Sequence, residues 1–331
     1  MAKKSKQVRT HKKGDWILTV LFSLISLVYI YPLFVVLVNS FKKKAFISRM
    51  PFSLPDAKAF VGWENYTNGL KKINFFDSLL NSVIITVLSV ALILLCTSMC
   101  AWFITRVRTK LTQGVYYLCL FSMIVPFQMV MFTLSKTADT LKLNTPLTIP
   151  VVYLGFGASL AVFMFCGYMK SCPIEIEESA MVDGCTPLRT FFSIVFPILQ
   201  PTYVTTAILE AMWIWNDYLL PYLVLNLKKF KTIPIAIQYL KGGYGTVDMG
   251  AMMAMLVLSI LPIVVLYLFL QKYIIKGIVA GAVKGGRDFP RRKHSASAGF
   301  LFVLEGSSPK VYTAMRPSRL DNICILVYND T

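Results

Sequence analysis

The strongest constraint on the fold of this chain is a set of six apolar stretches, each about 20 residues long. A helix of that length crosses the roughly 30 Å hydrocarbon core of a bilayer. Strands of a membrane barrel would instead alternate polar and apolar residues over about ten positions. We therefore predict an all-α, polytopic integral membrane protein. Its six transmembrane helices are expected at residues 16–38, 79–104, 115–134, 147–169, 201–225 and 250–271.

The composition and the charge support a membrane location. Of the 331 residues, 56% are hydrophobic and only 15% are charged, which is too apolar for an ordinary soluble domain. The net charge is +18, but the basic residues flank the apolar stretches, so we interpret them as topology signals and expect no nucleic-acid partner. Those before the first stretch place both termini and residues 171–200 in the cytoplasm. Lys42, Lys43 and Lys44 lie on the expected outer side and count against this orientation.

Several kinds of chemistry lack the residues they need. The seven cysteines include no CxxC pair, and we interpret them as packing residues. The two histidines, His11 and His294, lie in charged flanking segments, which leaves little material for a metal site or a Ser-His pair. The sequence has no phosphate-binding loop of the GxxxxGKS or GxxxxGKT type. We therefore predict no catalytic residue, metal or cofactor in this chain, and any ATP hydrolysis must come from a partner.

Residues 171–200, between the fourth and fifth stretches, are too polar to span a membrane. The whole chain has only 16 acids, yet four fall here within nine positions: Glu175, Glu177, Glu178 and Asp183. Most lie in the first turns of a helix expected to start near Pro173, where carboxylates interact favourably with the helix dipole. Gly184 is expected to end this helix, and Thr186 and Pro187 are typical of the start of a second one. The segment therefore predicts two short helices around a turn.

The same segment carries a spaced motif. The signature of binding-protein-dependent ABC importer permeases is Glu-Ala-Ala, three residues, Gly, nine residues, Ile, one residue, Leu-Pro. This chain has the same intervals, with serine for the first alanine and phenylalanine for the leucine, at Glu178, Ser179, Ala180, Gly184, Ile194, Phe196 and Pro197. The chain therefore resembles that family.

Further residues resemble the sugar-transporting branch, the family of the second membrane subunit of the maltose and multiple-sugar transporters. They are Trp215-Asn216-Asp217-Tyr218 with Pro221, Asn81-Ser82, and the ending at 271–285. The resemblance implies a permease subunit of an ATP-driven importer in the bacterial cell membrane, which translocates an oligosaccharide and is not itself an enzyme. It also implies the partners: a homologous second permease in a heterodimer, two ABC ATPase subunits that hold ATP and Mg, an extracytoplasmic sugar-binding protein, and membrane lipid.

The resemblance further implies a cytoplasmic coupling helix between transmembrane helices 4 and 5 that docks on the ATPase. From the residues alone, Glu178 is equally a solvated acid at a helix start, and Gly184 a helix end. Small side chains at Ala180 and Gly184 would let the helix enter a cleft on the partner. The residues expected to take part are Glu178, Ser179, Ala180, Asp183, Gly184, Ile194 and Pro197.

Polar residues in the fifth apolar stretch have two interpretations each. Glu210 has an ionisable side chain within a span, and such side chains usually face a polar interior, so it would line the transport pathway. In the other interpretation it is a protonated or hydrogen-bonded packing residue. Asn216 and Asp217 either contact sugar, or cap the helix end and pack against a subunit. In the outer loop, residues 226–249, contacts to the binding protein are predicted for Lys241, Gly242, Gly243 and Tyr244.

The predicted organisation has three parts. Residues 1–13 form a basic cytoplasmic head, residues 14–285 the transmembrane domain, and residues 286–331 a disordered tail outside the family pattern. Within the domain, residues 39–78 are rich in turn formers and aromatics and predict a small folded cap on the outer side. Two other functions stay open. One is a membrane-embedded glycosyl-transfer enzyme, which would need metal ligands or clustered surface acids. The other is a self-contained secondary transporter, for which an inverted repeat in the sequence would be expected.

Overall fold

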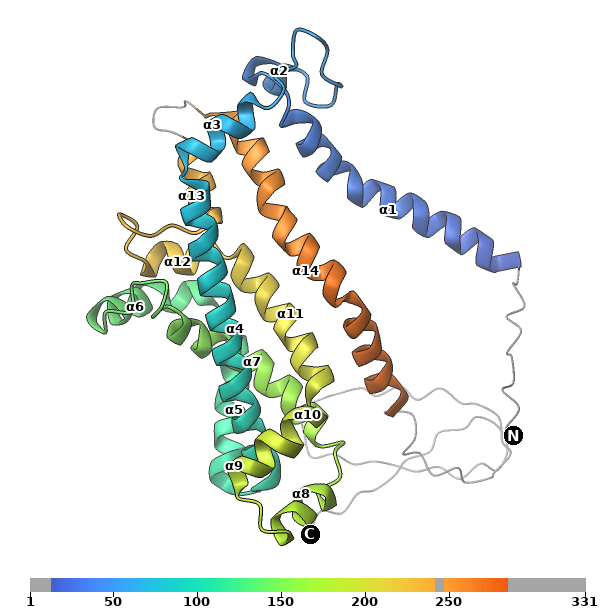
Figure 1. Ribbon diagram of the computed structural model, residues 1–331, viewed down its shortest axis with the longest axis vertical. Helices are drawn as coiled ribbons and strands as arrows, with labels where there is room; N and C mark the ends of the chain where they lie inside the picture. Colours follow the sequence, from blue (N-terminus) through green and yellow to red (C-terminus); the bar gives the residue numbers. More distant parts are fainter. Residues whose placement is uncertain (1–12, 242–246, 285–331) are drawn as a thin grey trace, which may run out of the picture. The chain divides into compact units, whose positions relative to one another are not determined.

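The computed structural model describes residues 13–241 and 247–284, and most of this part of the chain is helical (Figure 1). In the described ranges the one β-type contact is an isolated bridge between Lys42 and Phe60, so the all-α prediction is confirmed. The helices are α1 (Lys13–Asn39), α2 (Lys44–Arg49), α3 (Glu64–Lys72), α4 (Phe75–Arg106), α5 (Lys110–Ile124), α6 (Phe127–Thr140), α7 (Pro150–Met169), α8 (Glu175–Val182), α9 (Pro187–Thr190), a π-helix (Phe191–Val195), α10 (Phe196–Ile198), α11 (Gln200–Asn216), α12 (Leu219–Val224), α13 (Ile233–Gln238), a 3-10 helix (Tyr239–Lys241) and α14 (Met249–Lys284).

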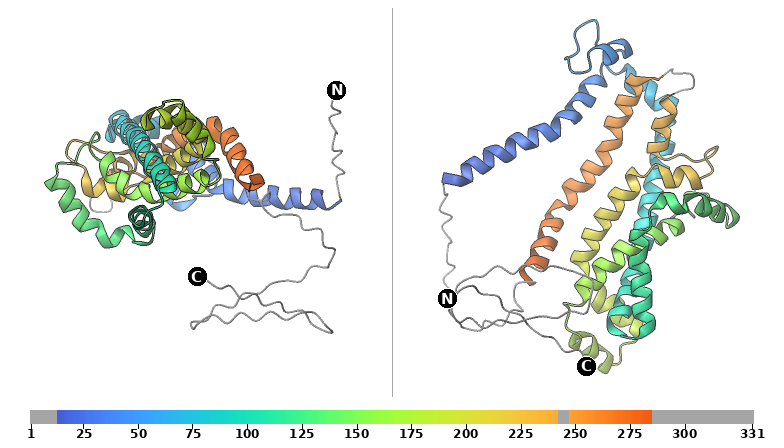
Figure 2. Two further views of the ribbon diagram at one scale, coloured as in Figure 1. Left: turned by 90° about the horizontal axis from the view of Figure 1, so that it is seen from below. Right: turned by 180° about the vertical axis from the view of Figure 1, so that it is seen from behind.

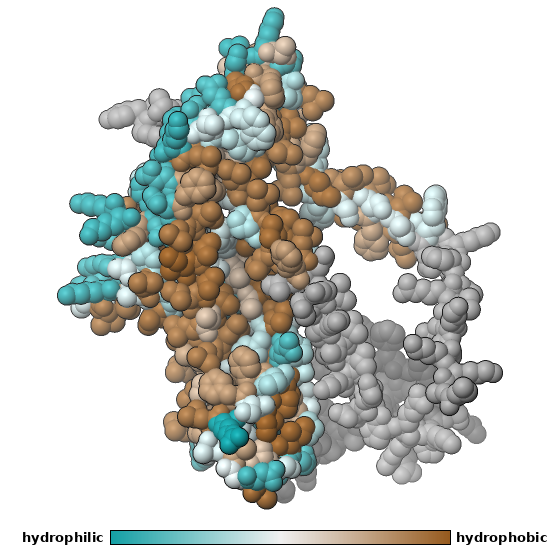
Figure 3. All heavy atoms as spheres, in the orientation of Figure 1, coloured by the Kyte–Doolittle hydropathy of each residue, from teal (hydrophilic) through white to brown (hydrophobic). Residues whose placement is uncertain are grey.

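The described helices provide four to six candidate membrane spans. Four are long and apolar enough on their own, and they are Trp16–Asn39, Phe75–Arg106, Pro150–Met169 and Met249–Phe269. Two more arise if each of two bent helix pairs is one span, namely Lys110–Ile124 with Phe127–Thr140, and Pro187–Ile198 with Gln200–Asn216. Hydrophobic residues cover much of the surface along the long helices (Figure 3). The chain is therefore a multi-pass membrane protein.

The third predicted span is broken in its middle. α5 and α6 meet at a bend of 108°. The backbone is extended at both intervening residues, with ψ 115° at Val125 and 134° at Pro126. A proline disfavours helical backbone at the residue before it and has no N–H for a helical hydrogen bond. The expectation of one continuous helix over residues 115–134 is therefore wrong, because a run of apolar residues does not reveal such a break.

The fifth predicted span also changes direction, after α11 ends. Asp217 is extended, with ψ 126°, and its Oδ1 accepts hydrogen bonds from the amides of Leu219 (3.0 Å) and Leu220 (3.4 Å). The hydroxyl of Tyr153 in α7 donates to Asp217 Oδ2 at 3.0 Å. The carboxylate thus stabilises the start of α12 and links it to α7, as the helix-capping interpretation of Asp217 requires.

The core lies where α4 packs along α7 and α11, with α5 against α7 (Figure 2). In lipid, close contact between helices rather than exclusion of water drives this packing, so small residues are favoured between them. A Cβ added at Gly157 would lie 2.5 Å from Ile93 Cδ1 and 2.9 Å from Glu210 Oε2. A larger residue would therefore require the side chains of Ile93 and Glu210 to move. Glu210 is 1% exposed and thus lies inside this group of helices.

Residues 39–78 form a folded cap, as predicted, that contains α2 and α3. The amide of the Asn65 side chain donates to the carbonyls of Ser40 (2.8 Å) and Lys42 (2.9 Å), and the hydroxyls of Ser40 and Tyr66 lie 2.7 Å apart. The Lys42 side chain is fully buried and donates from Nζ to the carbonyl of Met50 at 3.0 Å. Burial lowers the pKa of this amine. The cap is thus a packed unit and not a slack connection.

Candidate functional site

The acidic loop, residues 171–200, begins with α8 and a tight turn. The helix end is closed by two backbone hydrogen bonds: the amide of Gly184 donates to the carbonyl of Met181 (3.1 Å), and that of Cys185 to Ala180 (3.0 Å). Gly184 has φ +84°, in the left-handed region where a side chain is unfavourable. The prediction that Gly184 ends the first helix is confirmed.

The second half of the acidic loop starts as the sequence predicts. The hydroxyl of Thr186 accepts a hydrogen bond from the amide of Arg189 at 3.4 Å, and Pro187 takes the first helical position. The helix then changes type, because α9 has only four residues before the π-helix Phe191–Val195 and the short α10. A bend of 77° separates this part from α11. Short π-helical segments occur frequently at functional sites.

The two faces of α8 differ in exposure. Glu177 and Ala180, three residues apart and therefore on one face, are 3% and 7% exposed. Glu178 and Ser179 are exposed, and Val182 is 87% exposed. Ala180 thus packs inside this chain, contrary to the expectation that its small side chain enters a cleft on a partner.

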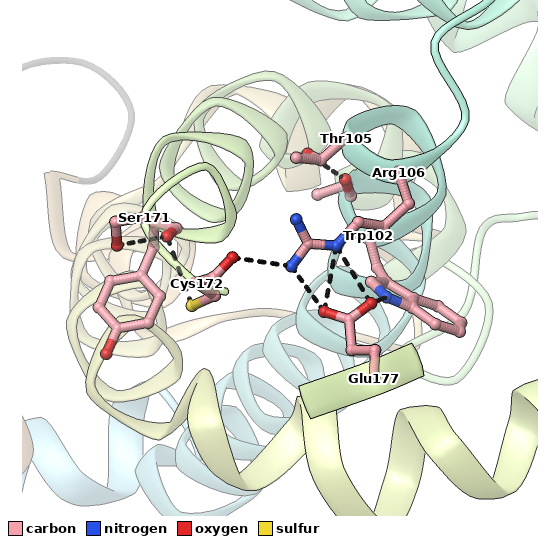
Figure 4. A network of polar contacts seen from close by, with 8 residues as sticks. Trp102, Thr105, Arg106, Ser171, Cys172 and Glu177 are labelled. Carbon is pink, nitrogen blue, oxygen red and sulfur yellow. Dashed lines mark hydrogen bonds and ion pairs between the residues drawn. The ribbon is translucent and has the colours of Figure 1, made fainter. Parts of the chain in front are cut away.

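Glu177 fastens α8 to the end of α4 (Figure 4). The indole Nε1 of Trp102 donates to its Oε2 at 2.7 Å. Arg106 donates from Nη2 to Oε1 at 2.6 Å, and its Nε lies 3.1 Å from both carboxylate oxygens. The same Nη2 donates to the carbonyl of Cys172 at 3.1 Å. Hydrogen bonds between ionised groups are about twice as strong as neutral ones, so this buried carboxylate is a firm link between the two helices.

Trp102 makes a second contact with the acidic loop. Its ring centroid lies 5.6 Å from that of Phe191, the first residue of the π-helix, which is fully buried. One tryptophan of α4 therefore contacts both helical halves of the loop, through its N–H in α8 and through its ring in the π-helix. The loop is held to α4 at two points and is expected to move with it.

Sequence reasoning gave no site role to Trp102 or Arg106, and it noted Glu177 only as one of four clustered acids. Glu177 directly precedes the spaced motif and lies three residues from Ala180, which was expected to face a partner, so the sequence offered no sign that Glu177 faces inward. Arg106 closes an apolar stretch and was interpreted only as part of a cytoplasmic segment. No sequence pattern pairs it with an acid 71 positions away.

The other predicted site residues that the structure describes do not come together in one group. Ile194 is partly buried and Pro197 is exposed in α10. Oε1 of Glu210 has no hydrogen-bond partner among the described residues, and Asn216 donates from Nδ2 to the carbonyl of Met212 at 2.7 Å. Lys241 ends the 3-10 helix, whereas Gly242, Gly243 and Tyr244 lie outside the described residues. Four of the predicted site residues lie together in the acidic loop with exposed side chains or backbone. They are Glu178, Ser179, Asp183 and Gly184.

A comparison with known protein families identifies the region that contains the spaced motif and the acidic loop. The family model described as "Binding-protein-dependent transport system inner membrane component" matches residues 93–279, more than half of the 331 residues. The chain belongs to this family. It is an ABC transporter permease, a membrane transport subunit and not an enzyme, and the resemblance seen in the sequence is confirmed.

Individual relatives and solved structures agree with this assignment. The permease is 38% identical over 269 residues to the "Probable starch degradation products transport system permease protein AmyC" of Thermoanaerobacterium thermosulfurigenes, covering 81% of this chain and 97% of the relative. It is 34% identical to the "Multiple sugar-binding transport system permease protein MsmG" of Streptococcus mutans serotype c, covering 80% and 95%. Its fold resembles a chain in the crystal structure of a bacterial ABC transporter involved in the import of the acidic polysaccharide alginate, with a TM-score of 0.64, 20% identity, and 82% and 99% of the two chains covered.

Proposed function

We propose that this permease imports an oligosaccharide, which an extracytoplasmic binding protein delivers, and that ATP hydrolysis on partner subunits drives the transport. The substrate class is supported by the names of the two relatives, which refer to starch degradation products and to multiple sugars. Both alignments extend over at least 80% of this chain, so they include the core helices as well as the acidic loop.

The acidic loop is the docking point for the ATPase. The observation that carries this proposal is the exposure of apolar side chains in this loop: Val182 is 87% exposed, Leu188 61% and Ile176 46%. Clustered exposed apolar residues rimmed by polar ones are typical of an interaction surface. Glu178, Ser179, Asp183 and Gly184 form the polar rim, and Ile194 and Pro197 hold the second half of the loop.

The proposed topology has six spans and both termini in the cytoplasm. In it, α5 with α6 forms the third span and α11 the main part of the fifth, with Pro187–Ile198 left outside the membrane, so the acidic loop lies inside between spans 4 and 5. The cap at 39–78 and the outer loop at 226–249 then face the extracytoplasmic side. The basic residues before the first span support this orientation, whereas Lys42, Lys43 and Lys44 after it count against it. The domain limits proposed with it are a cytoplasmic head at 1–13, the transmembrane domain at 14–285 and a dispensable tail at 286–331.

The permease works in a complex in the bacterial cell membrane. Its partners are a homologous second permease, two ABC ATPase subunits that hold ATP and Mg, and the sugar-binding protein; in the outer loop, Lys241, Gly242, Gly243 and Tyr244 contact the last of these. The description of the family as binding-protein-dependent supports the binding protein as a partner. The exposed apolar side chains along α1 require lipid or another membrane subunit to cover them.

Reconstitution tests this function. The chain is co-expressed with a companion permease and an ABC ATPase from the same genome, placed in vesicles with the binding protein, and supplied with a panel of oligosaccharides and monosaccharides. In the presence of the binding protein, we expect oligosaccharides but not monosaccharides to stimulate ATP hydrolysis and to be taken up. Uptake driven by an ion gradient without ATP would instead indicate a secondary transporter, and transfer of a labelled sugar to lipid would indicate a glycosyl-transfer enzyme.

A further inference from the structure

We propose that α4 is the element that carries movement across the membrane, from the acidic loop at one end to Lys231 and Ile233 in the outer loop at the other. The proposal rests on the docking role of the acidic loop given above and adds the path and the residues by which docking reaches the far side. Glu177 and Arg106 make the link at one end, and Asn81 and Ser82 make it at the other.

The link to the acidic loop is a carboxylate with three side-chain donor atoms around it. Trp102 Nε1, Arg106 Nε and Arg106 Nη2 all lie 2.6–3.1 Å from the oxygens of Glu177. Glu177 is 3% exposed, and the exposed acid beside it, Glu178, makes no contribution to this network. A displacement of α8 by the ATPase therefore pulls on α4 through Glu177, while Glu178 stays on the docking surface.

The link to the outer loop is made by hydrogen bonds near the other end of α4. The amide of Ile233, the first residue of α13, donates to the hydroxyl of Ser82 at 2.9 Å. The amide of the Asn81 side chain donates to the carbonyl of Lys231 at 3.3 Å. Thr232, which precedes α13, makes no side-chain cap, so Ser82 on the neighbouring helix satisfies an amide that α13 itself leaves unpaired. Ser82 and Ile233 are 3% and 1% exposed, so water does not compete for this bond.

The helix between these links is suited to act as a rod. α4 has 32 residues and no interior glycine or proline, which corresponds to about 48 Å at 1.5 Å per residue. The other described helices of span length are continuous but contain residues that weaken a helix: α1 contains Pro32, α14 contains Pro262 and α7 contains three glycines. Prolines and glycine pairs are the usual sites of helix kinks, so α4 resists bending where the others give way. A movement at Arg106 is thus transmitted to Ser82 and is not lost to bending of the helix between them.

Substitutions at both ends test this inference in the reconstituted complex. Glu177→Gln keeps the shape but removes the charge, and we expect sugar-loaded binding protein to stimulate ATP hydrolysis about tenfold less, since hydrogen bonds to ionised groups are the stronger kind. Ser82→Ala removes a neutral bond and should reduce stimulation about fivefold or less. Basal hydrolysis and co-purification of the ATPase should stay unchanged in both. A residue with only a structural role would lower yield and basal hydrolysis together.

Two matched controls accompany these variants. Glu175→Gln removes an exposed acid from α8, and Ser78→Ala removes a buried hydroxyl of α4 that bonds only to the carbonyl of Ile73 (3.3 Å); both should be stimulated normally. If Glu177→Gln does not assemble, the stimulation of ATP hydrolysis is measured in Trp102→Phe instead. This variant keeps an aromatic ring next to Phe191 and deletes one hydrogen bond to Glu177. Normal stimulation of the Glu177 or Trp102 variant together with normal stimulation of Ser82→Ala would overturn the proposal. If the acidic loop does not dock the ATPase at all, the result is different: the ATPase still binds when exposed residues of the loop, such as Gly184, are substituted.

Discussion

The inward and outward faces of the acidic loop have opposite chemistry although they alternate along the same few residues. On the inward face, Glu177 is buried and hydrogen-bonded to α4, and Phe191 is packed against Trp102. On the outward face, Glu178 is exposed and Val182 has almost its whole side chain free. The comparison shows that two neighbouring acids have different surroundings: Glu177 is bound within the chain, whereas Glu178 is exposed on the face proposed to meet the ATPase.

This difference changes how the acidic cluster is understood. Carboxylates in a first helical turn interact favourably with the helix dipole, and that applies to Glu177 and Glu178 alike. Only the buried carboxylate is held by a guanidinium and an indole, at a position that holds α8 in one orientation. The inward face thus links α8 to α4, while the outward face carries the side chains proposed to meet the ATPase.

The largest effect on the outward face is expected from Gly184→Trp. A Cβ at this position meets no atom of the chain within 4 Å, so the indole would project into the space that the ATPase occupies. The left-handed backbone adds about 1–2 kcal/mol of strain for any residue with a side chain. We expect the ATPase to be lost from the purified complex, while the permease still inserts into the membrane.

Gly184→Asn is the control, because asparagine tolerates the left-handed conformation better than other residues and is small. It should retain most of the bound ATPase. Equal loss of ATPase in both variants would attribute the effect to the turn and not to the outward face, and retention in Gly184→Trp would show that this face does not dock.

A smaller effect is expected from Thr186→Ala, which removes the cap of α9. The hydroxyl accepts one hydrogen bond from the amide of Arg189, and loss of an N-cap typically costs about 1 kcal/mol. We expect a modest fall in the thermal stability of the loop, measured by proteolysis of the purified complex at rising temperature, with ATPase binding weakened less than in Gly184→Trp. Thr186→Ser should behave as the parent, and a Thr186→Ala loop that resists proteolysis equally well would contradict the capping role.

The smallest effect is expected from Glu178→Ala. Ion pairs of exposed residues contribute about 0–1 kcal/mol, so the affinity for the ATPase should fall by less than about tenfold. Titration of the ATPase onto immobilised permease measures this change. A loss as large as that of Gly184→Trp would place a desolvated ion pair at Glu178 and would remove the distinction drawn between the two acids.

Local signals in the sequence predict a good part of this structure. Gly184 and Thr186 act through their own backbone or their nearest neighbours, and both take their expected places in the turn. The apolar stretches likewise locate the long helices, since a length near 20 residues is a property of the stretch itself. The breaks at Pro126 and Asp217 were harder to predict, because kinked and continuous spans have the same apolar composition.

Contacts between distant residues account for what the sequence could not predict. The carboxylate of Glu177 finds Arg106 and Trp102 only once α4 and α8 have been brought together, and Ser82 meets Ile233 across 151 positions. Neither pairing leaves a periodic or compositional pattern. Asn81 and Ser82 were noted because they resemble a family motif, and the structure gives a physical reason for these two residues, since they hold the outer loop to α4.

The most direct test of the account is the reactivity of a thiol on the outward face of α8. Val182→Cys is made in a chain whose seven native cysteines have been replaced, and inside-out vesicles are treated with a membrane-impermeant thiol reagent. Without the ATPase the thiol should react rapidly, and with the ATPase bound the rate should fall about tenfold or more, because reactivity requires access to solvent. Ala180→Cys on the inward face should react slowly in both cases. Equal rates at Val182→Cys with and without the ATPase would contradict the claim that this face is the docking surface.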